Sequence, residues 1–390
     1  MTLLAITHAH VVPIEGEPFD GTVLVRDGRI AELGPDIDVP DGTEVVDAAG
    51  GWLLPGFIDA HVHLGVDEEG EGWAGQDTNE MTDPVMAAAR AIDAINPVEV
   101  GFDDAIIGGI TAVNVNPGSG NPIGGLAVAI RTHGRVVDDM VLRSPSGLKA
   151  ALGENPKRVY GDRTQTPSTR LGVALTIRQA FARARAWGAK PADERDADLV
   201  SEALCRVLER EIPWRQHSHR ADDIATALRI AEEFGFDLVL DHGTESYLIA
   251  DKIAAAGVPV LYGPLIVSRS KVEVRHRTPK APGILTAAGV KVSIITDHPV
   301  VPIEFLVDQA ALAVKHGMAA QEALRAITLN PAEVLGLADR LGSLVPGKDA
   351  DLVLWEGDPL DLRHRTLQVW QAGQEVMRRD GSGEPVVAAR

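Results

Sequence analysis

Apolar and polar positions follow two different patterns along this chain of 390 residues. Near the N-terminus, alternating positions over residues 21–26 and 29–33 flank Asp27-Gly28, a pair that favours the tight turn of a β-hairpin. Near the C-terminus, residues 350–355 predict a strand and residues 368–377 predict a second hairpin. Because chain ends usually lie close together in a folded domain, we expect the two ends to pair with each other.

Between these ends, short apolar runs alternate with segments of helical periodicity, which is the pattern of repeated βα units. The predicted strands are residues 57–61, 110–115, 126–131, 140–143, 213–217, 238–241, 259–262 and 291–296. Residues 222–234 predict a helix, because their apolar side chains fall on one face and Gly235 favours a stop. Residues 153–196 are longer than a normal connection, so we expect extra helices or a lid there.

Eight βα units in series predict an α/β protein built on a (β/α)8 TIM barrel. We assign the barrel to residues 54–344, and a small β-sandwich domain formed by both chain ends to residues 1–53 and 345–390. The length of the chain agrees with this division, since such a barrel takes roughly 250 residues and leaves enough chain for one smaller unit.

The charge balance excludes two classes of partner. The chain has 37 basic and 56 acidic residues, a net charge of −19, so neither nucleic acid nor an anionic membrane is an expected partner. No apolar run reaches the roughly 18 residues that a membrane span requires. The single cysteine, Cys205, cannot form an internal disulfide, and we therefore expect a cytoplasmic protein.

The strongest chemical signal is the pair His61 and His63 at the end of the first predicted barrel strand. Side chains two residues apart on a strand point to the same face, so both imidazoles can face the barrel interior. Active sites of such barrels lie at the carboxyl ends of the strands, where this pair falls. Two packed or surface histidines are the alternative interpretation of the pair taken alone.

Further ligand-type residues fall at the ends of three other predicted strands. His217 and His219 end or follow the fifth strand, His242 follows the sixth and Asp297 follows the eighth. Imidazole nitrogens with one carboxylate suit Zn2+ or another divalent first-row metal. The sequence therefore predicts a metal site at the carboxyl-terminal mouth of the barrel.

Two segments of the chain resemble a known superfamily. Residues 55–63, from Pro55 to His63, are similar to the first-strand signature of the amidohydrolase superfamily. Residues 328–333 and 342–353 are similar to the closing segment of the same superfamily. Within it, the chain most resembles the imidazolonepropionase-like and prolidase-like metal-dependent hydrolases.

The resemblance implies a set of roles. His61 and His63 would be metal ligands from the first strand, His217 from the fifth and His242 from the sixth. Asp297 would be both a ligand and the catalytic group that takes a proton from the attacking water. A metal lowers the pKa of a bound water toward about 7, which would give hydroxide at neutral pH.

Two assignments stay open. His217 and His219 lie two residues apart, and we expect His217 to bind metal and His219 to act as a catalytic group facing the substrate. Many relatives carry a carboxylated lysine that bridges two metals, and Lys149 lies at the matching distance along the chain; a solvated helix residue is the alternative. Glu154 is a rival ligand. With Lys149 as a bridging ligand the site would hold two ions, and without it a single ion is expected.

The expected activity is hydrolysis of a carbon–nitrogen bond, in an amide or cyclic amide of a small molecule, by a metal-activated hydroxide. Related deaminases carry a glutamate three residues after the fifth-strand histidine, whereas this chain has Arg220 after His217, or the shorter Asp222 after His219. A ring aminohydrolase is therefore the weaker alternative. A dipeptidase-like hydrolase of short acyl-amino acids and a non-catalytic relative are the others.

Candidates for substrate binding follow the seventh strand. Tyr262 could hold a substrate carbonyl, and Arg269 could hold a substrate carboxylate, although a solvated loop charge explains Arg269 equally well. The loops carry no code for the substrate itself, because one fold supports many chemistries. A homo-oligomer is an expectation that depends on the resemblance alone.

Overall fold

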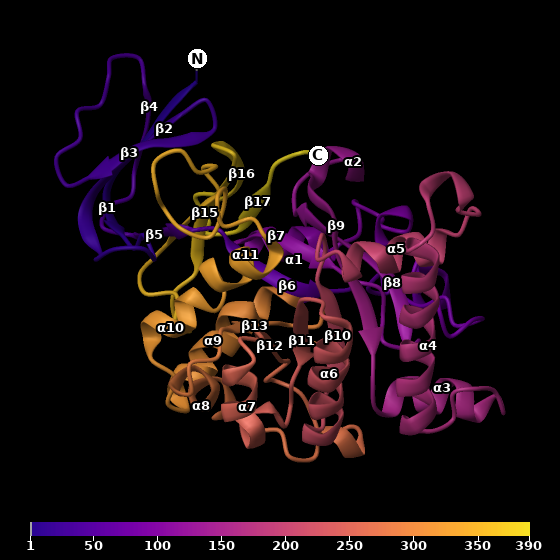
Figure 1. The fold of residues 1–390 in the computed structure, drawn as a ribbon. Coiled ribbons are helices and arrows are strands. Elements are labelled where there is room, and N and C mark those ends of the chain that lie inside the picture. Colours follow the sequence, from indigo (N-terminus) through magenta and orange to yellow (C-terminus); the bar gives the residue numbers. More distant parts are fainter. Residues whose placement is uncertain (1) are drawn as a thin grey trace.

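Strands from both ends of the chain form one sheet of nine strands in the computed structural model, which describes residues 2–390. The N-terminal strands are β1 (Leu3–Val11), β2 (Phe19–Arg26), β3 (Arg29–Gly34), β4 (Glu44–Asp47) and β5 (Trp52–Pro55). The C-terminal strands are β14 (Leu352–Trp355), β15 (Thr366–Gln371), β16 (Gln374–Arg379) and β17 (Pro385–Val387). Indigo and yellow ribbons therefore lie together in Figure 1.

The two ends meet where β5 pairs antiparallel with β14, with Leu53 opposite Leu354. The sheet runs in the order β17-β16-β15-β14-β5-β1-β2-β3, and β4 pairs with β1. The β2–β3 turn and the β15–β16 turn both bond to Ala350. Its N–H donates to Gly28 O at 2.8 Å, and its carbonyl accepts from Gly373 N–H at 2.9 Å. The predicted pairing of the chain ends is confirmed, and the strands of both ends form one continuous sheet.

The middle of the chain forms a second sheet of eight strands that follow one another in sequence order. They are β6 (Phe57–Val62), β7 (Ile110–Val115), β8 (Ile123–Arg131), β9 (Val141–Ala151), β10 (Trp214–Ser218), β11 (Leu238–His242), β12 (Val260–Tyr262) and β13 (Val292–Ile294). Each of the eight apolar runs identified in the sequence overlaps one of these strands. The barrel prediction is therefore confirmed.

The third strand departs from the regular βα repeat. β8 runs antiparallel to both β7 and β9. A parallel neighbour needs a crossover of roughly a dozen residues or more, and the connections over residues 116–122 and 132–140 are too short for one. The second connection contains only α2 (Val137–Met140). The short connections on both sides of β8 therefore make it antiparallel to its neighbours.

Helices surround the barrel (Figure 1). The longer ones are α3 (Glu154–Asp162), α4 (Arg170–Gly188), α5 (Leu199–Leu208), α6 (Ala221–Phe234) and α9 (Leu306–Lys315). The shorter ones are α1 (Gly101–Ile107), α7 (Ala250–Ala255), α8 (Ala281–Ala287), α10 (Ala320–Arg325) and α11 (Leu329–Leu335). Short 3-10 helices are η1 (Gly72–Gly75), η2 (Ala91–Asp93), η3 (Ala192–Glu194), η4 (Ser246–Ile249), η5 (Val272–Val274) and η6 (Ile303–Phe305).

Three of these helices answer sequence-based expectations. α3 and α4 lie within residues 153–196, where extra helices or a lid were predicted, and α6 ends at Gly235, which takes a left-handed conformation with φ 79°. Across residues 2–390, none of the helices combines the length and apolar character needed to cross a membrane.

Apolar side chains from the barrel strands pack with α11 in a separate core cluster. Val239 belongs to this cluster, and Asp241 lies two residues further along β11, so both project from the same face of the strand. Apolar packing therefore gives way to charged and polar groups toward the carboxyl ends of the strands.

A buried carboxylate joins the first and last strands of the barrel. Asp59 Oδ2 accepts hydrogen bonds from the backbone N–H of Thr296 at 2.9 Å and from its hydroxyl at 2.6 Å. Asp59 Oδ1 accepts from the N–H of His61 at 3.0 Å. Burial raises the pKa of Asp59 to about 7, and the hydrogen bonds from Thr296 and His61 act in the opposite direction.

We expect Asp59→Ala to lower the free energy of unfolding by about 3 kcal/mol, because it leaves two buried N–H donors without an acceptor. The measurement is urea unfolding of both proteins after chelation of metal. Asp36→Ala, at an exposed loop position, is the matched control and should change stability by less than about 0.5 kcal/mol. Equal losses in the two variants would contradict the role of Asp59.

Candidate metal centre

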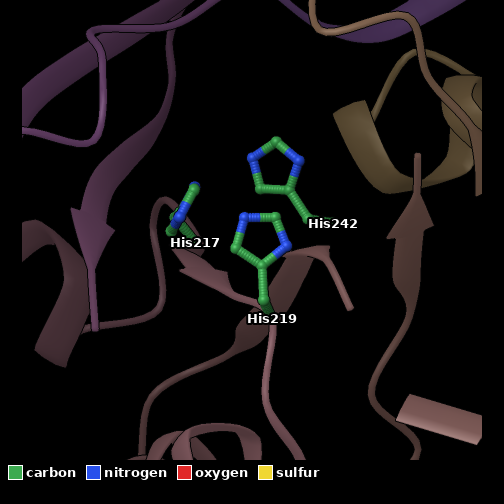
Figure 2. A group of neighbouring side chains, drawn as sticks. All are labelled: His217, His219 and His242. Atoms are coloured by element: carbon green, nitrogen blue, oxygen red, sulfur yellow. The ribbon is translucent and has the colours of Figure 1, made fainter. Parts of the chain in front are cut away.

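The predicted ligands converge at the carboxyl ends of their strands. His217 lies on β10 and His242 ends β11, whereas His63 and Asp297 follow β6 and β13. Ligand atoms of His217, His219 and His242 lie within 4.8 Å of one another, and so do those of His61, His242 and Asp297. Figure 2 shows the first of these groups, and His242 belongs to both.

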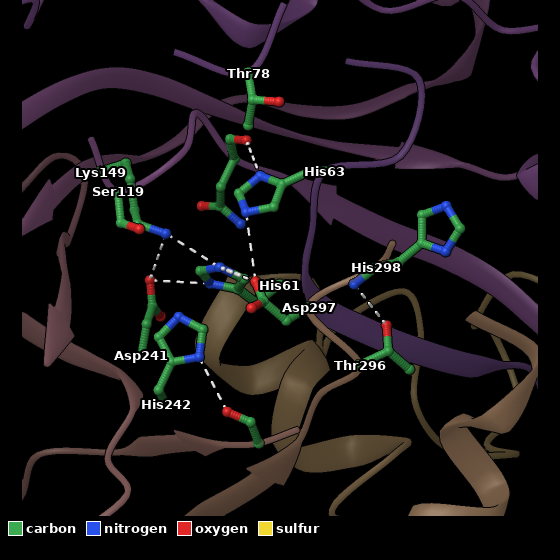
Figure 3. A network of polar contacts seen from close by, with 12 residues as sticks. His61, His63, Thr78, Ser119, Lys149, Asp241, His242, Thr296, Asp297 and His298 are labelled. Atoms are coloured by element: carbon green, nitrogen blue, oxygen red, sulfur yellow. Dashed lines mark hydrogen bonds and ion pairs between the residues drawn. The ribbon is translucent and has the colours of Figure 1, made fainter. Parts of the chain in front are cut away.

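Asp297 lies between the two histidines of the first strand. Its Oδ1 is 3.4 Å from His61 Nε2 and 3.4 Å from His63 Nε2, and Figure 3 shows these side chains pointing toward one another. Both imidazoles therefore face the same carboxylate, as the spacing of His61 and His63 predicted. Their service as metal ligands stays a prediction.

The second ring nitrogen of these histidines is held outside the cluster. His63 Nδ1 donates to Asn116 O at 2.8 Å, and His242 Nδ1 donates to Gly263 O at 3.0 Å. His219 Nδ1 lies 2.7 Å from the hydroxyl of Thr244. A carbonyl accepts only from N–H, so the Nε2 atoms of His63 and His242 are left unprotonated and free to bind a cation.

Several buried nitrogens of the cluster have no hydrogen-bond partner among the described residues. Among them are both ring nitrogens of His217 and Nε2 of His219. Buried polar atoms without partners are rare, because each costs about 1–3 kcal/mol. A divalent cation would satisfy one ring nitrogen of His217 and Nε2 of His219, so the donor set fits a metal of the zinc type.

The electrostatics favour neutral histidines beside an ionised carboxylate. Burial lowers the pKa of His242 to about 3, although Asp297 acts in the opposite direction. Burial and neighbouring basic groups lower the pKa values of His217 and His219 well below their usual range. Burial opposes ionisation of Asp297, but the combined attraction of His242, His61 and His63 lowers its pKa well below the ordinary value. These are the protonation states that metal ligands require.

The backbone is strained at two of the candidate ligands. His242 and Asp297 have φ angles of 71° and 56°, which lie in the left-handed region that L-residues rarely adopt. Such conformations cost roughly 1–3 kcal/mol and cluster at functional sites.

Lys149 lies on β9, and its side chain is fully buried beside the histidine cluster. Its Nζ is 3.1 Å from His61 Nε2 and 3.7 Å from Asp241 Oδ2, and burial lowers its pKa to about 8. The alternative of a solvated helix residue is therefore wrong. Glu154 instead begins α3, and its side chain lines a different cavity.

The sequence interpretation missed two charged residues beneath the cluster. Arg215 and Asp241 are fully buried, and Arg215 Nη2 donates to Ala60 O at 2.6 Å and lies 3.4 Å from Asp241 Oδ1. Asp241 Oδ2 lies 3.1 Å from His61 Nδ1 and so orients that ring. For Asp241, a charged residue after the apolar run 238–240 was the available signal.

The cluster opens into a cavity of about 470 Å3 whose lining includes His63, His217, His219, His242 and Asp297. A larger depression of about 920 Å3 lies at the opposite ends of β10, β11 and β12, next to Pro213, Asp237 and Pro259. Its described lining contains no histidine, so the chemistry belongs to the smaller cavity.

The two predicted substrate residues differ in position. Tyr262 lines the cavity, but its hydroxyl already donates to Thr278 O at 3.1 Å. Arg269 is exposed, and its Nε donates to Arg275 O at 2.9 Å. The cationic residues that line the cavity are instead Arg158, Lys271 and Arg277, which the sequence interpretation did not assign to substrate binding.

Comparison with known proteins adds a family match. The model of the Amidohydrolase family matches residues 52–377. The chain is 31% identical to amidohydrolase tasK of Hapsidospora irregularis, covering 90% of this chain and 39% of that protein, so it spans about two fifths of that relative's length. It is 30% identical to an imidazolonepropionase of Acidiphilium cryptum, covering 87% and 88% of the two chains.

The solved structure of an amidohydrolase from Thermotoga maritima MSB8 superposes with a TM-score of 0.94. It is 45% identical and covers 96% of this chain and 100% of that chain. The arrangement of both sheets is therefore shared over almost the whole chain.

We expect the protein purified without chelator to contain zinc or a similar divalent metal, and His61→Ala combined with Asp297→Ala to lose it, because the double variant removes two of the predicted ligands. The measurement is elemental analysis of both proteins. Arg269→Met, a change at an exposed residue, should keep the wild-type metal content. A metal-free wild-type protein with an intact fold would refute the site.

Proposed function

The chain belongs to the amidohydrolase family, and on that premise we propose that it is a metal-dependent hydrolase that cleaves a carbon–nitrogen bond in a small amide or cyclic amide. The observation that carries the proposal is the convergence of neutral, buried imidazoles with the ionised Asp297 at one mouth of the barrel. A cavity of about 470 Å3 opening from this cluster suits a small molecule.

We assign the metal to His61, His63, His217, His242 and Asp297, with Zn2+ as the ion that this set of nitrogen and oxygen donors favours. A divalent metal, when bound, supplies Lewis acidity that polarises a carbonyl and acidifies a water molecule. The two three-residue groups of ligand atoms support positions for one or two ions.

Asp297 is the proposed general base. Its carboxylate is ionised at neutral pH, so an Asp297 oxygen can accept a proton from the attacking water and then pass it to the leaving nitrogen. His219 lines the cavity with its Nε2 unpartnered among residues 2–390, and Thr244 holds the other ring nitrogen. We therefore assign His219 to orient the substrate carbonyl.

Lys149 is the proposed bridging ligand in a carboxylated form. Carboxylation requires the neutral amine, and a pKa lowered to about 8 by burial raises the neutral fraction at physiological pH. Its position next to His61 supports this role over Glu154, which lines a different cavity.

Hydrolysis of an amide is better supported than release of ammonia from a ring. Arg220 occupies the position three residues after His217, and its Nη2 pairs with Asp222 Oδ2 at 2.7 Å. The group there is a cation neutralised by its neighbour, not a carboxylate free to move protons.

We expect the metal-loaded protein to hydrolyse members of a panel of lactams, cyclic ureides and N-acyl amino acids, and Asp297→Asn to lower kcat by about 10²- to 10⁴-fold, since the general base is lost. The assay measures the new carboxylate and amine, with free ammonia followed separately. Stoichiometric ammonia from a ring substrate would instead assign the protein to the ring aminohydrolases.

For Lys149→Met we expect the metal content to fall by about one ion per chain and kcat to fall with it, because methionine fills the space without binding both ions. Short carboxylates such as formate, added to the variant, should restore part of the activity by replacing the carbamate. An unchanged metal content in Lys149→Met would remove the lysine from the site.

A further inference from the structure

Cationic side chains line the part of the cavity outside the histidine cluster. They are Arg158 from α3, and Lys271 and Arg277 from the segment between β12 and α8. The acidic residues of the lining are Asp67 and Asp297, of which Asp297 belongs to the ligand cluster. The lining therefore has more basic than acidic residues, whereas the chain as a whole has 37 basic and 56 acidic residues.

One of the three cations is already neutralised. Lys271 Nζ lies 3.1 Å from Glu273 Oε1, and Glu273 is buried with an exposed fraction of 1%. Lys271 also donates to Asn155 Oδ1 at 3.3 Å. Its charge therefore serves to hold the segment after β12 against α3.

The two arginines are not neutralised in this way. Neither Arg158 nor Arg277 forms an ion pair with any residue in the range 2–390. Arg277 Nη1 donates to Leu265 O at 3.3 Å, but its Nε is buried without an acceptor in the described chain. A buried guanidinium N–H without an acceptor is costly, and a ligand oxygen in the cavity would satisfy it.

We propose that the substrate carries a carboxylate at the end remote from the scissile carbon–nitrogen bond, and that Arg277, assisted by Arg158, binds this group. The inference rests on the proposed function, because it orients the substrate between the arginines and the metal ligands. A guanidinium presents parallel N–H donors in a planar fork that matches two carboxylate oxygens. The barrel mouth thus selects small anionic amides in an otherwise acidic protein.

The arginines act on binding and not on the bond that breaks. A remote anionic group is held equally in the ground state and the transition state, so its loss raises KM and leaves kcat nearly unchanged. This separates Arg277 from Asp297, whose loss lowers kcat.

The experiment uses binding, so that it does not depend on knowing the substrate. The probes are alkyl hydroxamates, whose hydroxamate end chelates the metal, with spacers of increasing length and either a carboxylate or a neutral carboxamide at the far end. Calorimetry with the zinc-loaded full-length chain measures the ratio of the two Kd values at each spacer length. A phosphonate series separates a carboxylate site from a general oxyanion site.

We expect the carboxylate to bind about 10- to 100-fold more tightly than the carboxamide at the best spacer length, as a charged hydrogen-bonded pair implies. Arg277→Met should remove most of this ratio and Arg158→Met part of it, while both keep the wild-type affinity for the carboxamide, which shows that the fold and the metal are intact. Arg275→Met, at an exposed residue of the same segment, should keep the full ratio.

Equal affinities for carboxylate and carboxamide in the wild-type protein overturn the inference and leave the hydrolase proposal standing. A ratio that survives in Arg277→Met, or that is lost in Arg269→Met instead, overturns the assignment to Arg277. Tighter binding of the phosphonate than of the carboxylate overturns the carboxylate class. Failure of every hydroxamate to bind the zinc-loaded chain overturns the proposed function, and the inference with it.

Discussion

The carboxylate of Asp241 contacts basic groups from three other strands of the barrel. Its oxygens lie 3.1 Å from His61 Nδ1, 3.7 Å from Lys149 Nζ and 3.4 Å from Arg215 Nη2. All four side chains are fully buried, and a charge alone in such surroundings would be strongly destabilising, so each is tolerated because the others compensate it. The same contacts fix the ring of His61 and therefore the direction of its Nε2. The ligand geometry of the first strand depends on this carboxylate, which lies beneath the metal-binding cluster.

His63 and His242 are held by the backbone that follows neighbouring strands. The carbonyl that orients His63 belongs to Asn116, just after β7, and the one that orients His242 belongs to Gly263, just after β12. Adjacent strands in a sheet lie about 4.8 Å apart, so the barrel itself sets the spacing between each ring and its anchor. The segments that line the cavity farther out, such as the one carrying Arg277, take no part in these contacts. The fold therefore separates the chemistry, which the strands fix, from substrate selection, which the loops can vary.

The sequence predicted the eight strands and the ligand-type residues at their ends, because buried strands are apolar runs and the polar residues that end them stand out. It did not predict that β8 runs antiparallel, since strand direction depends on the length of connections whose ends the pattern locates only approximately. The environment of Lys149 was also unclear, because a nearby Pro-Ser-Gly sequence resembles a bend, and only the pairing of β9 with β10 puts the lysine inside the barrel. The cations of the cavity, Arg158 and Arg277, come from segments far apart in sequence, so no local pattern could bring them together.

The position of His242 in both ligand groups has a consequence for how the centre fills. Its Nδ1 is engaged with the carbonyl of Gly263, so the imidazole has one electron pair to give. That pair can coordinate a single cation, and whichever group receives it leaves the other with two of its three members. Two ions bound by these two groups alone would therefore have unequal numbers of protein ligands, because only one of them can bind His242. If the ion at His217 and His219 receives it, His63 Nε2, which lies 3.4 Å from Asp297 Oδ1, is the third donor beside His61 and Asp297, and a carbamate on the buried amine next to His61 would add an oxygen donor.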